Sequence, residues 1–212
     1  MSLKNKKVLV TCGPTWVPID SVRVISNLSS GQLGQTIARD FAKAGARVTL
    51  AEGPVANPLK SNSVRIRKFS YFEELSGLVR DELRKDYDIC IHAAAVADFK
   101  LKRPVKTKIR SGPKTLRIDL VPTKKIIQQI KRMNPGVFLV GFKLEPGINK
   151  TNAVKITRSL FKRGMCDLVV ANSLKNGKYT GLVLGPKGKI FGFARSRAQL
   201  SKSLTRTVDQ NI

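Results

Sequence analysis

One stretch decides the fold class: TCGPTWVPIDSVRVISNLSSGQLGQTIARDFAKAGARVTL, residues 11–50. In its second half Leu33, Ile37 and Phe41 recur every fourth residue, which is the period of one face of a helix. The Ser/Gly-rich residues 29–34 open this helix, and a helix that begins in such a loop favours anions at its N-terminus. The apolar segments on either side predict two strands, so the stretch indicates a strand–helix–strand unit.

The Ser/Gly-rich loop does not follow the first strand directly. About fifteen residues separate the two, whereas a dinucleotide-binding loop begins within a few residues of its strand. Asp20, Arg23 and Asn27 lie in this insertion. The role of these three polar side chains therefore has to be explained.

Short β-branched runs alternate with helical patterns along most of the chain. This alternation predicts an α/β fold: a three-layer α/β/α, Rossmann-like sandwich with a mostly parallel sheet and ligands at the carboxyl ends of its strands. A hairpin over residues 180–194 and a last helix with Leu200, Leu204 and Val208 in register complete the pattern. Because 212 residues can bury one sizeable core, we expect a single domain over residues 1–212.

Residues 99–121 break this rhythm, because they are rich in lysine, arginine and proline. We expect a basic β-hairpin flap here, in which KTKIR, residues 106–110, pairs with TLRIDL, residues 115–120. Residues 111–113, Ser-Gly-Pro, form the turn. The flap is long enough to reach a neighbouring subunit.

The net charge of +26 makes a nucleic-acid-binding protein on a Rossmann-like scaffold an alternative. Its basic residues are spread over the chain and aromatic residues make up 6%, so no stacking platform for specific nucleic-acid binding is visible. The sequence contains no apolar run of about 18 residues, so it predicts no membrane span. The three cysteines lack metal-ligand spacing, and no secretory signal is visible. We therefore expect a cytoplasmic protein without a membrane association.

A second alternative is an NAD(P)-dependent short-chain dehydrogenase, which the Ser/Gly-rich loop favours. The late position of that loop opposes it. The Tyr-x-x-x-Lys pair that supplies the acid for carbonyl reduction is also absent, because Leu75, Ile91 and Val183 lie four residues beyond the three tyrosines.

The residues of the opening stretch favour a site for anions. Backbone N–H groups of the CGPT turn, with Gly13 and Thr15, form a concave anion-binding surface, and the loop at Ser29, Ser30 and Gly31 offers a second set of donors. The planar guanidinium of Arg23 suits phosphate oxygens. Asn27 carries both a hydrogen-bond donor and an acceptor, so it can hold a carbonyl or carboxylate group without neutralising it. Alternatively, Arg23 and Asn27 have no ligand and only fix a long loop in place.

Five blocks match a known family in order and spacing: GPTWVPIDSVRVISNLSSGQLG, AAAVADFKLK, KTKIR, VGFKLE and DLVVAN. Over residues 7–172 the chain resembles the phosphopantothenate–cysteine ligases, or phosphopantothenoylcysteine synthetases, of coenzyme A biosynthesis. The resemblance implies a ligase that joins 4′-phosphopantothenate to cysteine through an acyl-nucleotide made from CTP or ATP, with Mg²⁺. The sequence does not decide between CTP and ATP.

The resemblance also assigns residues. Lys108 matches the flap lysine that favours formation of the acyl-nucleotide, and Asn27 matches the asparagine that holds this intermediate for attack by cysteine. Arg23, Ala94 and Ala95 match the pocket for the 4′-phosphate, with Asn27 beside it. At the nucleotide site the resemblance adds Asp98, Lys108, Phe142, Asn172 and either Lys162 or Arg163 to the donors at Gly13, Thr15, Ser29, Ser30 and Gly31, with Asp98 as the Mg²⁺ ligand.

The resemblance implies partners as well. We expect a homodimer whose Asn27 and Lys108 regions lie near the interface. The family is often fused to a flavin-dependent decarboxylase, for which this chain has no room, so we expect a free-standing synthetase with a possible separate decarboxylase partner.

Overall fold

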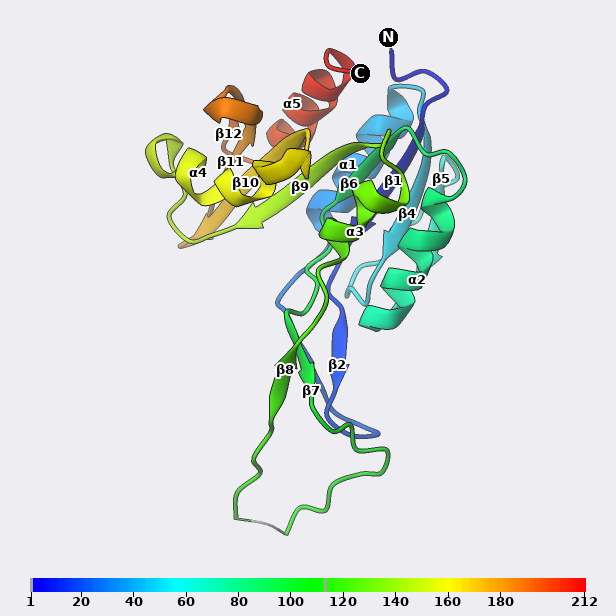
Figure 1. Cartoon of the computed structure of the whole chain (residues 1–212), viewed down its shortest axis with the longest axis vertical. Helices are drawn as coiled ribbons and strands as arrows, with labels where there is room; N and C mark the ends of the chain where they lie inside the picture. The colour runs from blue at the N-terminus through cyan, green and yellow to red at the C-terminus, as the bar shows by residue number, and fades with distance from the viewer. Residues whose placement is uncertain (1, 113) are drawn as a thin grey trace.

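A mostly parallel sheet forms the centre of the molecule (Figure 1). The computed structural model describes residues 2–112 and 114–212, without the side chain of Arg163. The eight strands follow the order β12-β11-β10-β9-β6-β1-β4-β5, and only β11 and β12 run antiparallel to their neighbours. Their bounds are β1 Lys7–Cys12, β4 Arg47–Glu52, β5 Val64–Lys68, β6 Ile89–His92, β9 Phe138–Leu144, β10 Leu168–Lys175, β11 Lys178–Leu184 and β12 Ile190–Ala194.

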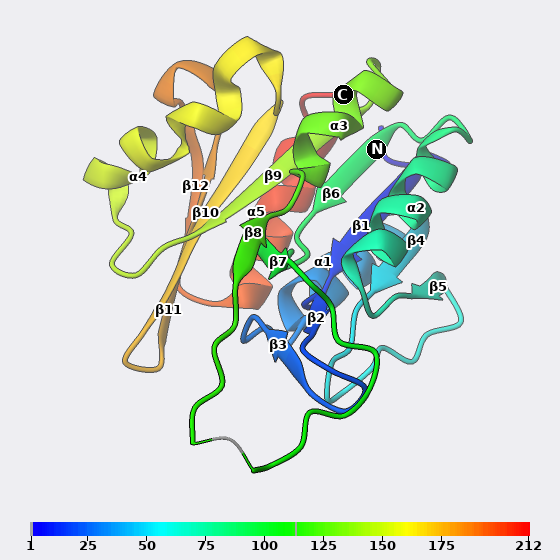
Figure 2. The same ribbon diagram turned by 60° about the horizontal axis from the view of Figure 1, so that its bottom comes forward.

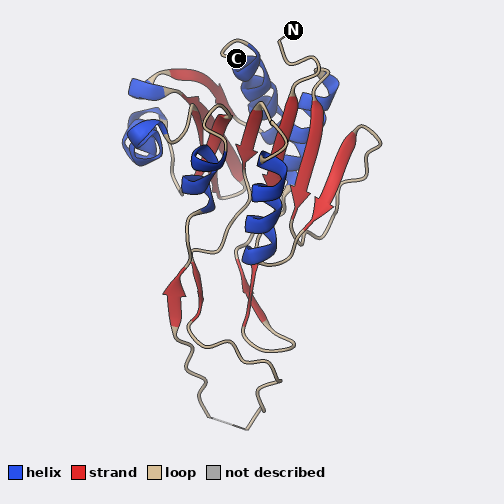
Figure 3. Ribbon diagram, turned by 45° about the vertical axis from the view of Figure 1, so that its right-hand side comes forward, coloured by secondary structure: helices blue, strands red, loops and turns tan. Residues whose placement is uncertain are grey.

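Helices cover both faces of this sheet (Figure 3). One face packs against α1, Gln32–Lys43, and α5, Arg197–Asp209. The other packs against α2, Phe72–Leu83, and α3, Ile126–Met133, with α4, Lys150–Thr157, and the 3₁₀ segments η1, Arg158–Gly164, and η2, Pro186–Gly188, towards the β12 edge. The α/β/α sandwich expected from the alternating pattern is confirmed. None of the described helices is long and apolar enough to cross a membrane.

The two cores follow from the alternation of side chains along the strands. In β1, Val8, Val10 and Cys12 pack with α1 and α5, whereas Leu9 packs with α2 and α3. All four side chains are buried because β1 has a strand on each side and helices on both faces.

A close contact at Gly34 fixes α1 against the end of β1. A Cβ atom at Gly34 would lie 2.4 Å from Cβ of Cys12. Glycine at this position therefore lets the first turn of the helix touch the strand, and the N-terminus of α1 lies beside the carboxyl end of β1.

The residues inserted between β1 and α1 form part of a long extension below the sheet (Figures 1 and 2). Strands β2, Trp16–Pro18, and β3, Val24–Ser26, pair with each other. Beside them, β7, Phe99–Leu101, pairs with β8, Leu120–Pro122. A small apolar cluster of Val17, Ala97 and Leu101 with Ile118 joins the two hairpins.

The expected pairing of residues 106–110 with residues 115–120 is wrong. Strand pairing is confined to the base of the flap, where β7 meets β8, and residues 102–119 contain no strand among those described; Pro113 of the expected turn lies outside the described residues. The expected pairing would set basic side chains of residues 106–110 against Arg117 on a two-stranded ribbon with no sheet behind it. Like charges on facing strands and the absence of a third strand both disfavour that ladder.

His92 joins β6 to β1 at the carboxyl edge of the sheet. Ala94 N donates to Thr11 Oγ1 at 3.1 Å, so the Thr11 hydroxyl hydrogen is left to donate to His92 Nδ1, 3.0 Å away. This contact suits a neutral imidazole, and burial lowers the pKa of His92 from 6.5 to about 4.

We expect Gly34→Ala to lower the free energy of unfolding by about 1–3 kcal/mol, because the added methyl group pushes α1 away from β1. Gly77→Ala is the matched control in α2, since its Cβ atom would meet nothing closer than the flexible Arg80 side chain at 3.7 Å. Alanine is the better helix former, so Gly77→Ala should raise stability by up to about 1 kcal/mol. Urea denaturation measures both, and equal effects would contradict the contact at Gly34.

The lowered pKa of His92 predicts a loss of stability in acid. The folded protein favours the neutral form of His92. The contribution of His92 to the free energy of unfolding is therefore complete above pH 6.5 and is lost as the pH falls towards 4. The loss amounts to about 3 kcal/mol. His92→Asn keeps an acceptor for Thr11 without a titrating group, so its free energy of unfolding should fall less between pH 7 and pH 4. Parallel pH profiles for the two proteins would contradict this assignment.

Candidate active site

A cleft of about 930 Å³ runs along the carboxyl edge of the sheet. It lies over the ends of β1, β6, β9 and β10, on the side from which the extension leaves (Figure 1). Nine residues of the site expected from the sequence line it: Asn27, Ser29, Ser30, Gly31, Ala94, Ala95, Asp98, Phe142 and Asn172.

The loop before α1 presents free backbone donors to this cleft. Gly31 is the N-cap of α1 with φ 71°, and no side chain caps the helix. The first turn of α1 holds no acidic residue. The N–H groups at this helix end are therefore available to an anionic ligand. Gly31 is required here because its φ is positive and a Cβ atom would lie 2.8 Å from Cγ1 of Val55.

Asn27 connects this loop to the end of β6. Its Nδ2 donates to Ala95 O at 3.1 Å and to Val96 O at 3.3 Å. The side chain thus has the loop-fixing role considered as an alternative. Its Oδ1 remains an acceptor at the exposed rim of the cleft.

The CGPT turn holds the segment after β6, and its expected role in anion binding stays a prediction. Gly13 O accepts from Ala95 N at 2.8 Å, and Thr15 N donates to Ala95 O at 3.3 Å. Thr15 is fully buried, and its Oγ1 accepts from Ala97 N at 2.8 Å. Neither Gly13 nor Thr15 is among the described residues that line the cleft. The contacts with the segment after β6 use the N–H and hydroxyl groups of Thr15 but only the carbonyl group of Gly13.

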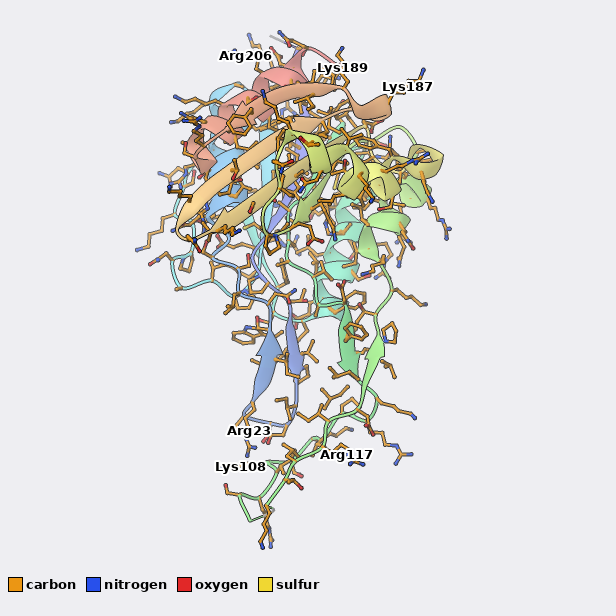
Figure 4. All side chains as sticks on the ribbon, turned by 90° about the vertical axis from the view of Figure 1, so that its left-hand side faces the viewer. Arg23, Lys108, Arg117, Lys187, Lys189 and Arg206 are labelled. Atoms are coloured by element: carbon orange, nitrogen blue, oxygen red, sulfur yellow. The ribbon has the colours of Figure 1, made fainter. Side chains whose placement is uncertain are left out.

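Arg23 and Lys108 lie at the far end of the extension, away from the cleft of their own chain (Figure 4). Arg23 Nη2 donates to Ile109 O at 2.8 Å, and the buried Asp20 accepts from Ile109 N at 3.1 Å. Asp20 also accepts from the backbone of Val22 and Arg23, each at 2.9 Å, and these donors, Val22 foremost, hold its pKa below the ordinary value.

Asp20 and Arg23 therefore form a clip on the backbone of Ile109, the residue after Lys108. The sequence analysis singled out Asp20 without a role, and the clip supplies it. Lys162 lies exposed on η1 and does not line the cleft, and the side chain of Arg163 lies outside the described part of the chain. The structure therefore does not bring Lys162 to the cleft, and a role for Arg163 stays a prediction.

Asp98 is the one carboxylate among the described residues that line the cleft. It forms an exposed ion pair with Lys125. In the described chain no three His, Cys, Asp or Glu side chains gather as a metal site. The donor set suits a Mg²⁺ ion that brings most of its ligands with a nucleotide, since proteins often hold Mg²⁺ with one or two carboxylates and substrate phosphates.

Four cations line the cleft that the sequence analysis did not assign: Lys124, Lys125, Lys143 and Arg197. Lys124 and Lys125 directly precede α3, a position at a helix N-terminus that suits anions and that could have been recognised. Arg197 comes from the start of α5, and no local pattern connects it to the site. The described residues that line the cleft thus include these four cations and a single carboxylate. This excess of positive charge favours a polyanionic ligand.

The model of the DNA/pantothenate metabolism flavoprotein C-terminal domain family matches residues 3–198. A coenzyme A biosynthesis bifunctional protein CoaBC of Thermococcus kodakarensis is 42% identical over 176 residues, which are 82% of this chain and 43% of that protein. The chain spans less than half the length of the curated relatives it matches first.

Two solved structures share the fold. A DNA/pantothenate metabolism flavoprotein from Streptococcus pneumoniae superposes with a TM-score of 0.86 at 25% identity, covering 98% of this chain and all of that one. A Cab2 variant in complex with phosphopantothenate-cysteine has a TM-score of 0.78 at 20% identity, covering 98% and 87%. The family expected from the five sequence blocks is confirmed: the chain belongs to the family of the DNA/pantothenate metabolism flavoprotein C-terminal domain.

Proposed function

We propose that the chain is a phosphopantothenate–cysteine ligase that uses CTP or ATP. The observation that carries the proposal is the cleft, which gathers residues from four of the five sequence blocks around an uncapped helix N-terminus. The name of the relative from Thermococcus kodakarensis and the ligand in the Cab2 complex support the same reaction.

The chemistry requires two transfers. A carboxylate oxygen of 4′-phosphopantothenate attacks the α-phosphorus of the nucleotide, and pyrophosphate leaves. The cysteine nitrogen then bonds to the acyl carbon and loses a proton, and the nucleoside monophosphate leaves as the acyl–oxygen bond breaks. No side chain has to act as nucleophile. Cys12, the thiol in the cleft, is unsuited to that role because burial and the nearby Glu52 raise its pKa to about 12.

The residues of the cleft divide this work. The free N–H groups at Ser30 to Gln32 face developing charge on the phosphates. Asp98 would hold Mg²⁺, which would neutralise phosphate charge when bound together with the nucleotide. Asn27 binds the acyl end of the substrate through Oδ1 or by releasing its amide from Ala95 and Val96.

We further propose a homodimer in which the extension of one copy reaches the cleft of the other. Lys108 lies far from its own cleft (Figure 4), so a role at the α-phosphate requires a large movement of the loop or a second subunit. Apolar side chains are exposed along the extension, among them Val22 at 64% and Phe99 at 52%. Such a surface is typical of an interface.

We expect Lys108→Gln to abolish acyl-nucleotide formation, with a loss of on the order of 10²–10³ in rate, because it removes a cation from the α-phosphate. Lys106→Gln is the matched control, since it makes the same change two residues away on the same exposed loop. Pyrophosphate release from 4′-phosphopantothenate, Mg²⁺ and each nucleotide, with and without cysteine, measures the first transfer.

Asn27→Asp should affect the second transfer instead, because it places a negative charge beside the acyl oxygen. The acyl-nucleotide should then accumulate and be detected by mass spectrometry. Wild-type rates of product formation for both Lys108→Gln and Asn27→Asp would contradict these roles. An unchanged melting temperature is the control for Asn27→Asp, which also loses the hydrogen bonds to Ala95 and Val96.

The dimer is tested by mass in solution. Sedimentation at micromolar concentration should give twice the chain mass for the wild type and a reduced mass for Val22→Asp, which places a charge on the exposed turn between β2 and β3. Val154→Asp on α4, also exposed at 37%, is the matched control and should remain dimeric. A fully active monomer would contradict the proposal.

A further inference from the structure

The β12 edge of the sheet has no part in the reaction described so far. β12 is the outermost strand and pairs with β11 alone, so its other side is open. α4 and the short segment η2 lie beside it, and α5 follows it in the chain (Figure 1). Among the described residues, those of β12, α4 and η2 do not line the cleft.

This end of the molecule carries charge of one sign. Residues 146–208 hold thirteen lysines and arginines and a single acid, Asp167. The carboxylate of Asp167 pairs with Lys131 of α3, which lies outside this range. The segments around β12 therefore have almost no negative charge of their own to balance their cations.

Three exposed lysines lie at this edge, and we call them the edge lysines: Lys150, Lys187 and Lys189. Lys187 and Lys189 point away from the molecule at the end opposite to Lys108 (Figure 4). In the part of the chain that the structure describes, no carboxylate forms an ion pair with an edge lysine. η2 lies against α4, because a Cβ atom at Gly188 would be 3.0 Å from Cγ1 of Val154.

An irregularity in the pairing turns the side chains of β12 to both faces of the sheet. The register between β11 and β12 shifts near the start of β12. As a result, Ile190 and Phe193 lie opposite core residues of the α4 face, whereas Phe191 packs with the core on the α5 face. Lys150 Nζ lies 5.6 Å from the ring centroid of Phe193, and Lys189 Nζ lies 4.6 Å from that of Phe191. Each ring thus has an ammonium group beside it.

Single-stranded nucleic acid has the chemistry that this edge fits. Its bases stack on aromatic side chains, and lysines bind the phosphates between them. Phe193 is 43% exposed, so a base can reach its ring. A lysine that already lies over a ring is placed to meet the phosphate next to a stacked base. Every base has a flat face, so such binding does not depend on sequence.

An anionic membrane would also attract the edge lysines, but the geometry favours a flexible chain. Insertion into a membrane requires apolar side chains that reach below the headgroups. No apolar side chain of β12 is more than 43% exposed. The two pairs of lysine and ring lie on opposite faces of β12, so a flat bilayer would contact one pair at a time, whereas a single strand can follow the edge and contact both.

We propose that the β12 edge is a second binding site of this protein and takes single-stranded nucleic acid of any sequence. The edge lysines bind phosphates, and bases stack on Phe193 and Phe191. The site is independent of the ligase reaction, because its residues lie outside the cleft. A local pattern does not show the pair of Lys150 and Phe193, since α4 and β12 are distant in the chain.

The charge contacts are tested by fluorescence anisotropy of the full chain with a labelled strand of about 20 thymidines. Lys150→Gln and Lys189→Gln should each reduce the slope of log affinity against log salt by about 0.7, because each removes one phosphate contact. Lys60→Gln is the matched control. It removes the same charge from an exposed lysine before β5, at the opposite edge of the sheet, and should keep the wild-type slope.

The stacking contact is tested with Phe193→Leu, which keeps an apolar side chain and removes the ring. It should weaken the thymidine strand on the order of tenfold and leave the affinity for poly-glutamate, which has no bases, unchanged. Phe99→Leu makes the same change at an exposed phenylalanine on the extension and should keep the wild-type affinity.

Several results would overturn the inference. No binding at about 50 mM salt would do so, as would an equal loss of slope in Lys60→Gln, which would indicate general charge attraction. Displacement of the strand by excess Mg·CTP or Mg·ATP would place it in the cleft instead. Poly-glutamate that loses affinity in Phe193→Leu as the strand does would assign the edge to an acidic polypeptide. Tighter binding to vesicles of equal phosphatidylcholine and phosphatidylglycerol, lost in Phe193→Leu, would assign it to a membrane. The lysine variants decide the inference even if Phe193→Leu does not fold.

Discussion

The contact between Gly34 of α1 and Cys12 of β1 is the constraint on which the site depends. It holds the first turn of the helix against the end of the strand, so the N-terminus of α1 opens onto the carboxyl edge of the sheet. Because Gly31 caps the helix without a side chain, the backbone donors of that turn remain free. The position of the cleft therefore follows from the close contact between α1 and β1, which only glycine permits at residue 34. No charged side chain is required to form this contact.

The insertion between β1 and α1 has a structural role in addition to the ligand contact proposed for Asn27. The Thr15 hydroxyl accepts a hydrogen bond from Ala97 N, and the Asn27 amide donates to the carbonyl groups of Ala95 and Val96. Both side chains therefore hold the segment after β6. At the far end, Asp20 and Arg23 hold the backbone of Ile109. The insertion thus connects the rim of the cleft to the loop that carries Lys108.

The positions of the acidic residues help to explain why the surface of the molecule is basic. Of the fourteen Asp and Glu residues, Glu52, Glu82 and Asp20 are buried and serve as acceptors inside the fold. Glu52 accepts from Gln35, Leu59 and Lys68, and Glu82 accepts from Arg67, Lys85 and Tyr87. Glu52 and Glu82 also pair with half-exposed cations, Lys68, Arg65, Arg67 and Lys85, but fourteen acids cannot balance forty lysines and arginines. The surface is left strongly basic, as Arg23, Lys108, Arg117, Lys187, Lys189 and Arg206 at both ends of the molecule illustrate (Figure 4), which suits a polyanionic ligand.

The sequence by itself determined the layers, the alternation of strands and helices in the sandwich, the family and the loop at Ser29 to Gly31, because these depend on local periodicity and on residues close in the chain. It did not determine where the flap strands pair, since like charges and the lack of a supporting sheet moved the ladder to β7 and β8. Nor did it show that Thr15 is buried or that Lys108 lies remote from its own cleft. Only the tertiary structure brought Tyr179 and Arg197 beside Asn172: such contacts depend on how the sheet orders β10 and β11 and on where α5 begins, and a pattern along the chain reports the face of a residue but not its distant neighbours.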